Sequence, residues 1–216
     1  MSTRLRVVVF TLNPELETTR WWKALISHDA VTSVLVCRQS RVRTPRQVVR
    51  RFWRNLRKHG PLFIPYRLWH LFIDILRSAR QGKSPGVVEQ HRPPVEYIET
   101  HGMHGPEVVQ QIAKWEPDLG LSLGAPALRK SLFRLPPLGT LNLHLGRLPE
   151  FRGGPPAFWE LFRGSDRIGA TVHWIDERLD TGDVAGSAEA PIYRRDSLKT
   201  AEARAAELGA TILVLT

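Results

Sequence analysis

Short apolar runs alternate along the chain with stretches of helical periodicity. Residues 5–12 (LRVVVFTL) and 31–37 (VTSVLVC) are rich in β-branched residues and predict two buried strands. Between them, residues 15–28 predict a helix, with Asn13 as its N-cap and Pro14 in its first turn. A strand–helix–strand order of this kind predicts a parallel sheet.

The second half of the chain continues this alternation. We expect strands over residues 95–98, 119–123, 140–143, 169–175 and 184–190, and helices over 105–114, 127–133, 155–163 and from about 197 onward. The last two of these strands are expected to pair antiparallel at one edge of the sheet. The predicted fold class is therefore α/β, a Rossmann-like, mostly parallel sheet flanked by helices.

A strongly basic segment interrupts the pattern. Residues 38–83 contain 13 Lys and Arg and a single acid, Asp74, whereas the rest of the chain has 18 basic and 20 acidic residues. The net charge of +10 therefore comes from this segment. Because its apolar residues recur at helical spacing, we predict a helical hairpin over about 41–83, inserted into a single catalytic domain that spans 1–216.

The basic hairpin has three possible roles. Its aromatic residues could enter an anionic membrane surface while its arginines bind lipid headgroups. It could instead dock an anionic acceptor or a nucleic acid. In the third interpretation, its apolar face packs on the domain's own sheet and its charges are solvated. The composition alone leaves all three open.

The chain has no run of about 18 apolar residues, so we predict no membrane-spanning helix. Its one cysteine, Cys37, ends an apolar run and is predicted to be a buried thiol. A single cysteine forms no internal disulfide, which suits a reducing compartment. We therefore expect a cytoplasmic protein, peripheral at the inner membrane face if the hairpin binds lipid.

The candidate chemistry lies in LNLHLGRLPEFRGG, residues 141–154, and RLDTGDV, residues 178–184. Asn142 and His144 are two residues apart on a predicted strand, so their side chains point to one face. An amide can donate to an oxyanion, a histidine can move protons and a carboxylate such as Asp180 can orient the histidine, which together suit acyl transfer. Alternatively, Asn142 and His144 only satisfy backbone groups at a strand end, and Asp180 only forms a turn.

These motifs resemble those of the folate-dependent formyltransferases, which include glycinamide-ribonucleotide, methionyl-tRNA and amino-sugar N-formyltransferases. NLHLGRLPEFRGGPPAFW is similar to the family's Asn-x-His signature and its Leu-Pro-x-x-Arg-Gly continuation, and RLDTGDV is similar to its Leu-Asp-x-Gly loop. The interval of 36 residues between His144 and Asp180 also matches the family. The likeness covers about residues 107–198 well and 5–37 loosely.

The resemblance implies formyl transfer from 10-formyltetrahydrofolate to a primary amine. Asn142 would hydrogen-bond the developing oxyanion, His144 would stabilise that oxyanion or carry a proton, and Asp180 would position His144 and a relay water. The resemblance places the donor's pterin against two segments, largely through backbone groups, with contacts at Gly124, Ala125, Pro126, Leu128, Asp176 and Leu179. Gly153 would lie beside the acceptor amine. Arg152 would meet an anionic acceptor, unless it is only a surface arginine.

We predict no catalytic or metal-binding role for three further histidines. His173 is interpreted as structural. His101 and His104 lie three residues apart, but no further ligands accompany them, so no metal site is predicted.

Three departures from the family pattern bear on the acceptor. Leu145 follows the candidate histidine where the family often has Pro or Gly, which could reshape the acceptor mouth. The first strand leads into TLNPELETT rather than a glycine-rich loop, which argues against glycinamide ribonucleotide. The chain also ends after the catalytic domain, whereas methionyl-tRNA formyltransferases carry a further tRNA-binding domain, so we expect tRNA not to be the acceptor.

The expected acceptor is therefore the amine of an amino sugar or sugar nucleotide, an anionic small molecule. One alternative is a non-catalytic homologue that binds folate or a membrane. Another is a hydrolase that releases formate from the same folate. Retention of Asn142, His144 and Asp180 together argues against the first alternative.

Overall fold

The computed structural model describes residues 4–40 and 93–215. The predicted basic hairpin over 41–83 lies outside the described residues. Its helical structure and its three possible roles therefore stay predictions.

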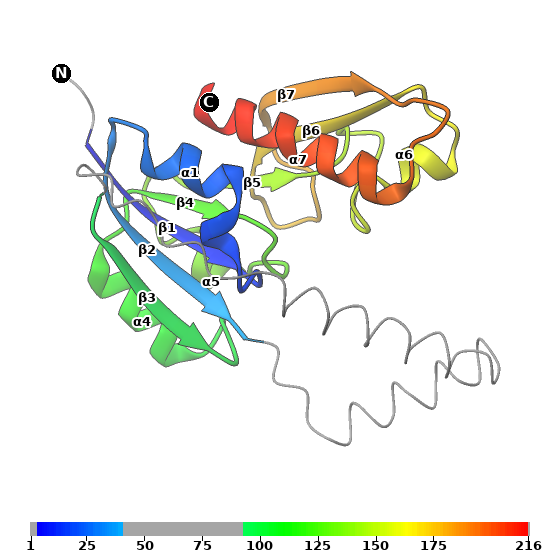
Figure 1. The fold of residues 1–216 in the computed structure, drawn as a ribbon. Coiled ribbons are helices and arrows are strands. Elements are labelled where there is room, and N and C mark those ends of the chain that lie inside the picture. Colours follow the sequence, from blue (N-terminus) through cyan, green and yellow to red (C-terminus); the bar gives the residue numbers. More distant parts are fainter. Residues whose placement is uncertain (1–3, 41–92, 216) are drawn as a thin grey trace, which may run out of the picture. The chain divides into compact units, whose positions relative to one another are not determined.

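A seven-stranded sheet organises the described residues, in the order β3-β2-β1-β4-β5-β6-β7. Strands β1 to β5 run parallel, whereas β6 pairs antiparallel with both β5 and β7. The strands are β1 Leu5–Thr11, β2 Val31–Gln39, β3 Val95–Thr100, β4 Leu119–Ser122, β5 Thr140–His144, β6 Arg167–Trp174 and β7 Val184–Pro191. The predicted mostly parallel α/β sheet with an antiparallel edge is confirmed (Figure 1).

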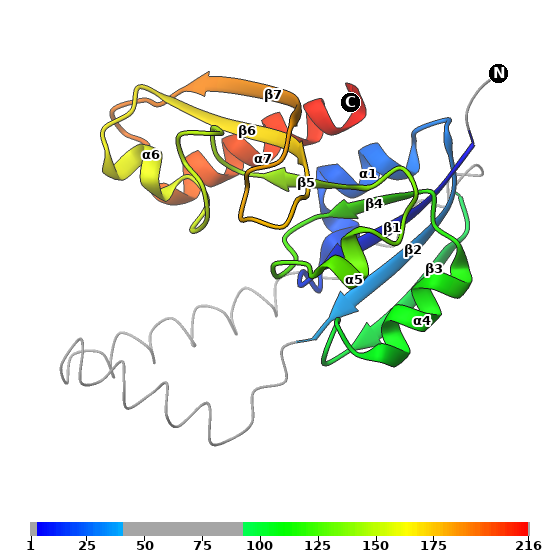
Figure 2. The same cartoon turned by 180° about the vertical axis from the view of Figure 1, so that it is seen from behind.

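Helices cover both faces of the parallel part of the sheet, as Figure 2 shows from behind. The helices α1 (Arg20–Ile26) and α7 (Leu198–Leu215) pack on one face, and α4 (Pro106–Trp115) and α5 (Lys130–Phe133) pack on the other. The short helix α6 (Phe158–Phe162) lies between β5 and β6 in the chain.

Strand β1 shows why its sequence is an unbroken apolar run. Val7 and Val9 belong to the core under α1 and α7, whereas Val8 and Phe10 belong to the core against α4 and α5. All four are essentially inaccessible to solvent. A strand buried on both faces has no polar alternation, as is usual for parallel sheets.

Several predicted helix boundaries are wrong. The helix expected over 15–28 is a 3-10 turn, η1 (Leu16–Thr18), followed by α1. Thr19 adopts an extended conformation between them and caps α1 by accepting a hydrogen bond from the Trp22 backbone at 3.2 Å. Asn13 instead accepts a hydrogen bond from the Glu15 backbone at 3.0 Å, forming a turn.

Two further helices are shorter than predicted. The helix expected over 155–163 begins only at Phe158, after the paired prolines Pro155 and Pro156. The helix expected over 127–133 begins only at Lys130. The residue before each helix is not helical, because Arg129 is extended before α5 and Ala157 is left-handed, with φ of 59°, before α6.

Small residues on α7 let it approach the sheet closely. Ala201 and Ala205 are fully buried, and a Cβ atom at Gly209 would come within 2.9 Å of the Leu143 side chain on β5. The Trp21 indole of α1 also donates to the Ala206 carbonyl of α7 at 2.8 Å. Helix α7 therefore supports the strand that carries the candidate catalytic residues.

The single cysteine is buried, as predicted. Its burial, together with the negative charge of Glu99, raises the pKa of the Cys37 thiol to about 12. None of the described helices has the length and apolar character needed to cross a membrane.

Candidate active site

Strand β5 places Asn142 and His144 on the same side of the sheet. Their neighbours Leu141 and Leu143 point to the opposite side and join the core under α7. Asn142 is paired with Ser122 of β4 on one side and with His173 of β6 on the other. The predicted shared face of Asn142 and His144 therefore lies where the parallel part of the sheet meets its antiparallel part.

His144 is fixed by a hydrogen bond at one ring nitrogen and faces a carboxylate with the other. Its Nε2 lies 2.7 Å from the Phe151 carbonyl oxygen. Because a carbonyl can only accept, this nitrogen carries a hydrogen. Its Nδ1 lies 3.6 Å from Oδ2 of Asp180, and both side chains are only 10% exposed. A proton taken up at Nδ1 would therefore be held next to the carboxylate.

Gly146 is needed for this arrangement. A Cβ atom at Gly146 would lie 2.6 Å from Nε2 of His144 and 3.1 Å from the Phe151 carbonyl oxygen. Any larger residue would push the ring away from that carbonyl. The Leu145-Gly146 departure from the family pattern is thus compatible with a well-placed histidine.

Asp180 connects three parts of the site. It occupies a left-handed backbone conformation, with φ of 50°. Its Oδ2 accepts a hydrogen bond from the Gly153 backbone at 2.9 Å, and its Oδ1 lies 3.5 Å from Nε2 of His173. Burial acts to raise the pKa of Asp180, but the contacts with His173 and Gly153 and the adjacent histidines outweigh it and hold the pKa below its ordinary value. Asp180 is therefore a carboxylate at neutral pH.

His173 belongs to the site, although we interpreted it from sequence as structural. Its Nδ1 donates to the Trp174 carbonyl oxygen at 2.9 Å, which leaves Nε2 free to accept. In the neutral ring Nε2 accepts a hydrogen bond from the Asn142 amide nitrogen at 3.1 Å, whereas in the protonated ring Nε2 carries a hydrogen that faces Asp180 at 3.5 Å. The ring is 3% exposed. His173 therefore fixes the orientation of the Asn142 amide as well as contacting Asp180.

The sequence contained one signal for this role. The alternation in GATVHWI places Thr171 and His173 on the same face of a strand. We expected that strand to pair with 184–190, and it does, but its other partner is β5. Only this second pairing sets His173 directly opposite Asn142.

A cavity of about 380 Å³ opens beside these four polar residues. The two segments predicted to hold the donor form its walls, namely residues 124–128 and 176–179. All six predicted donor contacts line it, as does Gly153. Arg152 does not line it and is exposed. The structure therefore brings together every predicted site residue except Arg152.

The segment at residues 176–179 is held in shape by its own side chains. The Asp176 carboxylate accepts hydrogen bonds from the Thr181 hydroxyl, at 2.7 and 2.8 Å, and from the Arg178 backbone at 2.9 Å. These bonds, the Thr181 one foremost, lower the pKa of Asp176. The Asp176 carboxylate therefore fixes the turn that forms this wall of the cavity.

A second hollow shares residues 175–178 with the first as part of its wall. It measures about 650 Å³ and is more open, with Phe133, Arg134 and Trp174 among its walls. None of the four polar residues of the site lines it. We therefore place the candidate chemistry in the smaller cavity.

In residues 4–40 and 93–215, no group of three or more His, Cys, Asp or Glu side chains could hold a metal ion. His101 lies 2.8 Å from the Ser40 hydroxyl. Burial and the positive charge of Arg129 lower the pKa of His104.

A family model described as formyl transferase matches residues 73–216. The methionyl-tRNA formyltransferase of Syntrophus aciditrophicus is 34% identical over 118 residues, which are 54% of this chain and 38% of that protein. The enzyme of the same name from Geobacillus thermodenitrificans is 30% identical over 130 residues, 60% of this chain and 41% of that protein. The chain thus matches less than half of the length of these relatives.

Solved structures share the fold at low sequence identity. Phosphoribosylglycinamide formyltransferase from Anaplasma phagocytophilum has a TM-score of 0.64 at 16% identity, covering 98% of this chain and 83% of that one. A sugar N-formyltransferase from Shewanella sp. FDAARGOS_354 has a TM-score of 0.60 at 15% identity, covering 97% and 67%. A formyltetrahydrofolate deformylase from Pseudomonas syringae pv. tomato has a TM-score of 0.62 at 17% identity, covering 99% and 60%. These matches concern the fold alone.

Proposed function

Because this chain belongs to the formyl transferase family, we propose that it transfers a formyl group from 10-formyltetrahydrofolate to a primary amine. One observation carries the proposal. An amide, two histidines and a carboxylate meet at one end of a cavity whose other walls are the two predicted donor segments. The donor would supply the formyl group, and the residues of this chain would position it and stabilise the charge that develops.

The cavity suits a flat, polar ring. Its volume of about 380 Å³ falls in the range typical of small-molecule sites. Along residues 124–128 its wall consists of glycine, alanine, proline and leucine, so a ring can approach the backbone closely. Residues 176–179 also line the cavity, where the Arg178 N–H is already engaged by Asp176. These features support donor binding through backbone hydrogen bonds.

The polar end of the cavity suits acyl transfer. Asn142 would donate from its amide, whose orientation is fixed by His173, to the oxygen on which negative charge develops. As the amine nitrogen bonds to the formyl carbon, His144 would take up the amine's proton at Nδ1, where Asp180 stabilises the resulting cation. The bond from the formyl carbon to N10 would then break, and His144 would return the proton to N10 of the leaving tetrahydrofolate. Asp180 would also hold Gly153, through its backbone N–H, at the acceptor side of the cavity.

For the acceptor we propose an amino sugar or sugar nucleotide. The sugar N-formyltransferase among the structural neighbours supports this class. The lack of a glycine-rich loop after β1 supports it against glycinamide ribonucleotide. The curated relatives are named for methionyl-tRNA, so tRNA is the competing acceptor.

The test is a formyl-transfer assay with 10-formyltetrahydrofolate and a panel of amines. The panel contains amino sugars, nucleotide-linked amino sugars, glycinamide ribonucleotide and methionyl-tRNA. We expect formylation of a sugar amine and its loss in Asn142→Ala. Formylation of methionyl-tRNA alone would overturn the acceptor class. No formylation by a folded protein that also fails to bind 5-formyltetrahydrofolate in calorimetry would overturn the proposed activity itself.

A hydrolase is a second candidate, because a formyltetrahydrofolate deformylase shares this fold. In that reaction water would replace the amine at the same polar end of the cavity. Formate release measured without any amine separates the two. Release that is slow and is suppressed by an amine acceptor supports the transferase, and rapid release that no amine alters supports the hydrolase.

A further inference from the structure

The helix α6 carries a cluster of three aromatic rings close in the chain to Gly153 and Gly154, which line the cavity. The ring centroids of Phe158 and Phe162 lie 5.7 Å apart in a stacked arrangement. Trp159 meets Phe158 edge-on at 5.1 Å and Phe162 edge-on at 5.9 Å. Phe158 and Trp159 are partly buried, whereas Phe162 is 71% exposed. Phe162 is thus held in place by its neighbours while its outer surface stays open.

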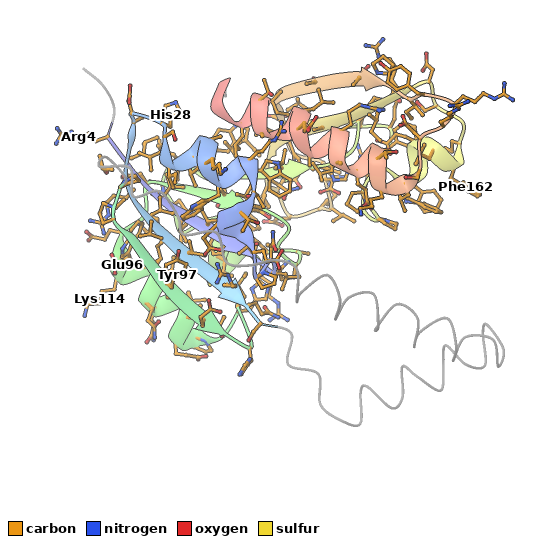
Figure 3. The ribbon with its side chains drawn as sticks, in the orientation of Figure 1. Arg4, His28, Glu96, Tyr97, Lys114 and Phe162 are labelled. Atoms are coloured by element: carbon orange, nitrogen blue, oxygen red, sulfur yellow. The ribbon has the colours of Figure 1, made fainter. Side chains whose placement is uncertain are left out.

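The aromatic cluster is joined directly to the wall of the cavity. The Trp159 indole donates to the Gly154 carbonyl oxygen at 3.3 Å. Gly153 and Gly154 line the cavity, and the Gly153 backbone donates to Asp180. An acceptor whose amine lies at Gly153 would therefore extend past Gly154 toward α6. Figure 3 shows the Phe162 side chain at the outer edge of α6.

Two exposed arginines accompany the cluster. Arg152 immediately precedes Gly153, and Arg163 immediately follows Phe162. The Arg163 guanidinium lies 5.9 Å from the ring of Phe151, the residue whose carbonyl oxygen fixes His144. Aromatic rings stack with nucleobases, and guanidinium groups pair with phosphates. The cluster and the two arginines therefore carry the two kinds of contact that a nucleotide makes, stacking and phosphate pairing.

On these grounds, and resting on the proposed function, we propose that Phe158, Trp159 and Phe162 form a platform for the nucleobase of a nucleotide-linked amino sugar. Arg152 and Arg163 would bind its diphosphate. The base would stack on the open face of Phe162, and the sugar amine would reach Gly153. This assigns the acceptor's nucleotide to α6 and its amine to the cavity.

The charge of this region favours a compact nucleotide over a nucleic acid. Residues 4–40 and 93–215 contain 18 basic and 19 acidic residues. Nucleic-acid binding depends on neutralising many phosphates. The platform itself offers two arginines, which match the two phosphates of a nucleoside diphosphate.

Calorimetry with nucleoside diphosphates tests the platform. Uridine and thymidine diphosphates are titrated into the full chain, with inorganic pyrophosphate as the probe that lacks a base. We expect at least one nucleotide to bind more tightly than pyrophosphate. Phe162→Ala should weaken that binding about tenfold, because stacking contributes on the order of 1–3 kcal/mol per base. Phe162→Tyr should retain it, because the ring remains.

Leu138→Ala serves as the matched control, because Leu138 is also an exposed apolar residue, at 53%, and lies outside the cavity walls. It should leave nucleotide binding unchanged. Equal affinity for nucleotide in wild type and Phe162→Ala, or no preference over pyrophosphate, would overturn the platform. Tight binding of tRNA that Phe162→Ala weakens, with no nucleotide binding, would overturn the sugar-nucleotide occupant.

A parallel titration with 5-formyltetrahydrofolate separates this proposal from the proposed function. Phe162→Ala should bind the folate as wild type does, because α6 does not line the donor part of the cavity. Folate binding without nucleotide binding would reject the platform and leave formyl transfer standing. Nucleotide binding without folate binding would reject formyl transfer instead.

Discussion

The two sides of the cavity are built from opposite kinds of residue. The side formed by residues 124–128 presents backbone and small apolar side chains, from a loop that follows a parallel strand. The side formed by β5 and β6 presents Asn142, His144 and His173, each held by a hydrogen bond. The first side can recognise a ligand but has no group that can move a proton. We infer that substitutions on the two sides affect different steps, donor binding on one and turnover on the other.

The largest expected effect is that of Asn142→Ala. It removes the amide proposed to stabilise developing negative charge, and loss of one such donor typically costs roughly 2.7–4 kcal/mol in the transition state. We expect turnover to fall by about a hundredfold or more, while calorimetry shows unchanged affinity for 5-formyltetrahydrofolate. Wild-type turnover in the folded variant would contradict the role of Asn142 in stabilising charge. A parallel loss of folate affinity would show that this side of the cavity also binds the donor.

His173→Phe tests whether His173 acts through Asn142. The substitution removes the acceptor at Nε2 and leaves the Asn142 amide without its partner at that position. Because a hydrogen bond of this kind contributes about 0.5–1.5 kcal/mol to the position of the amide, we expect turnover to fall about tenfold. In the double variant with Asn142→Ala, the further loss should be much smaller. Full additivity of the two effects would show that His173 does not act through the amide.

Ala125→Leu tests the opposite side of the cavity. The added carbons would occupy space beside the donor, and inserting methylenes into a packed site typically costs about 1–3 kcal/mol. We expect the dissociation constant of 5-formyltetrahydrofolate to rise about tenfold and turnover at saturating donor to stay near the wild-type value. A fall in saturated turnover with unchanged affinity would reverse the assignment of the two sides.

The smallest expected effect is a pH dependence of stability at Asp180. Its pKa in the folded protein lies below the unfolded value of about 3.9, so its carboxylate stabilises the fold fully above that value. This contribution is lost as the pH falls through the lower, folded pKa. We expect urea unfolding of wild type and Asp180→Asn to differ at pH 7 and to converge below about pH 4. A difference that grows on acidification would contradict the sign of the shift.

The order of the elements was largely predictable from local pattern, and their boundaries were less so. The buried strands are continuous apolar runs, which Val7 to Phe10 illustrate, and such runs depend little on distant residues. The start of α1 depends on the extended conformation of Thr19 and on its cap, and the sequence offered Asn13 as an equally good cap. Capping residues compete locally, so the choice among them falls to tertiary packing.

The sequence by itself determined the class of the sheet, because strand alternation is a local property, and it suggested Asn142, His144 and Asp180 as candidate site residues through the motifs of a resembling family. Only the tertiary structure decided the partners of these residues. The pairing of β5 with β6 sets His173 opposite Asn142, and the turn at Asp180 brings its carboxylate between two histidines and to the Gly153 backbone. Such contacts join residues about 30 positions apart in the chain. Hydrogen bonds and charges act over a few ångströms in space, so the sequence can suggest the groups, but only the folded chain sets the distances between them.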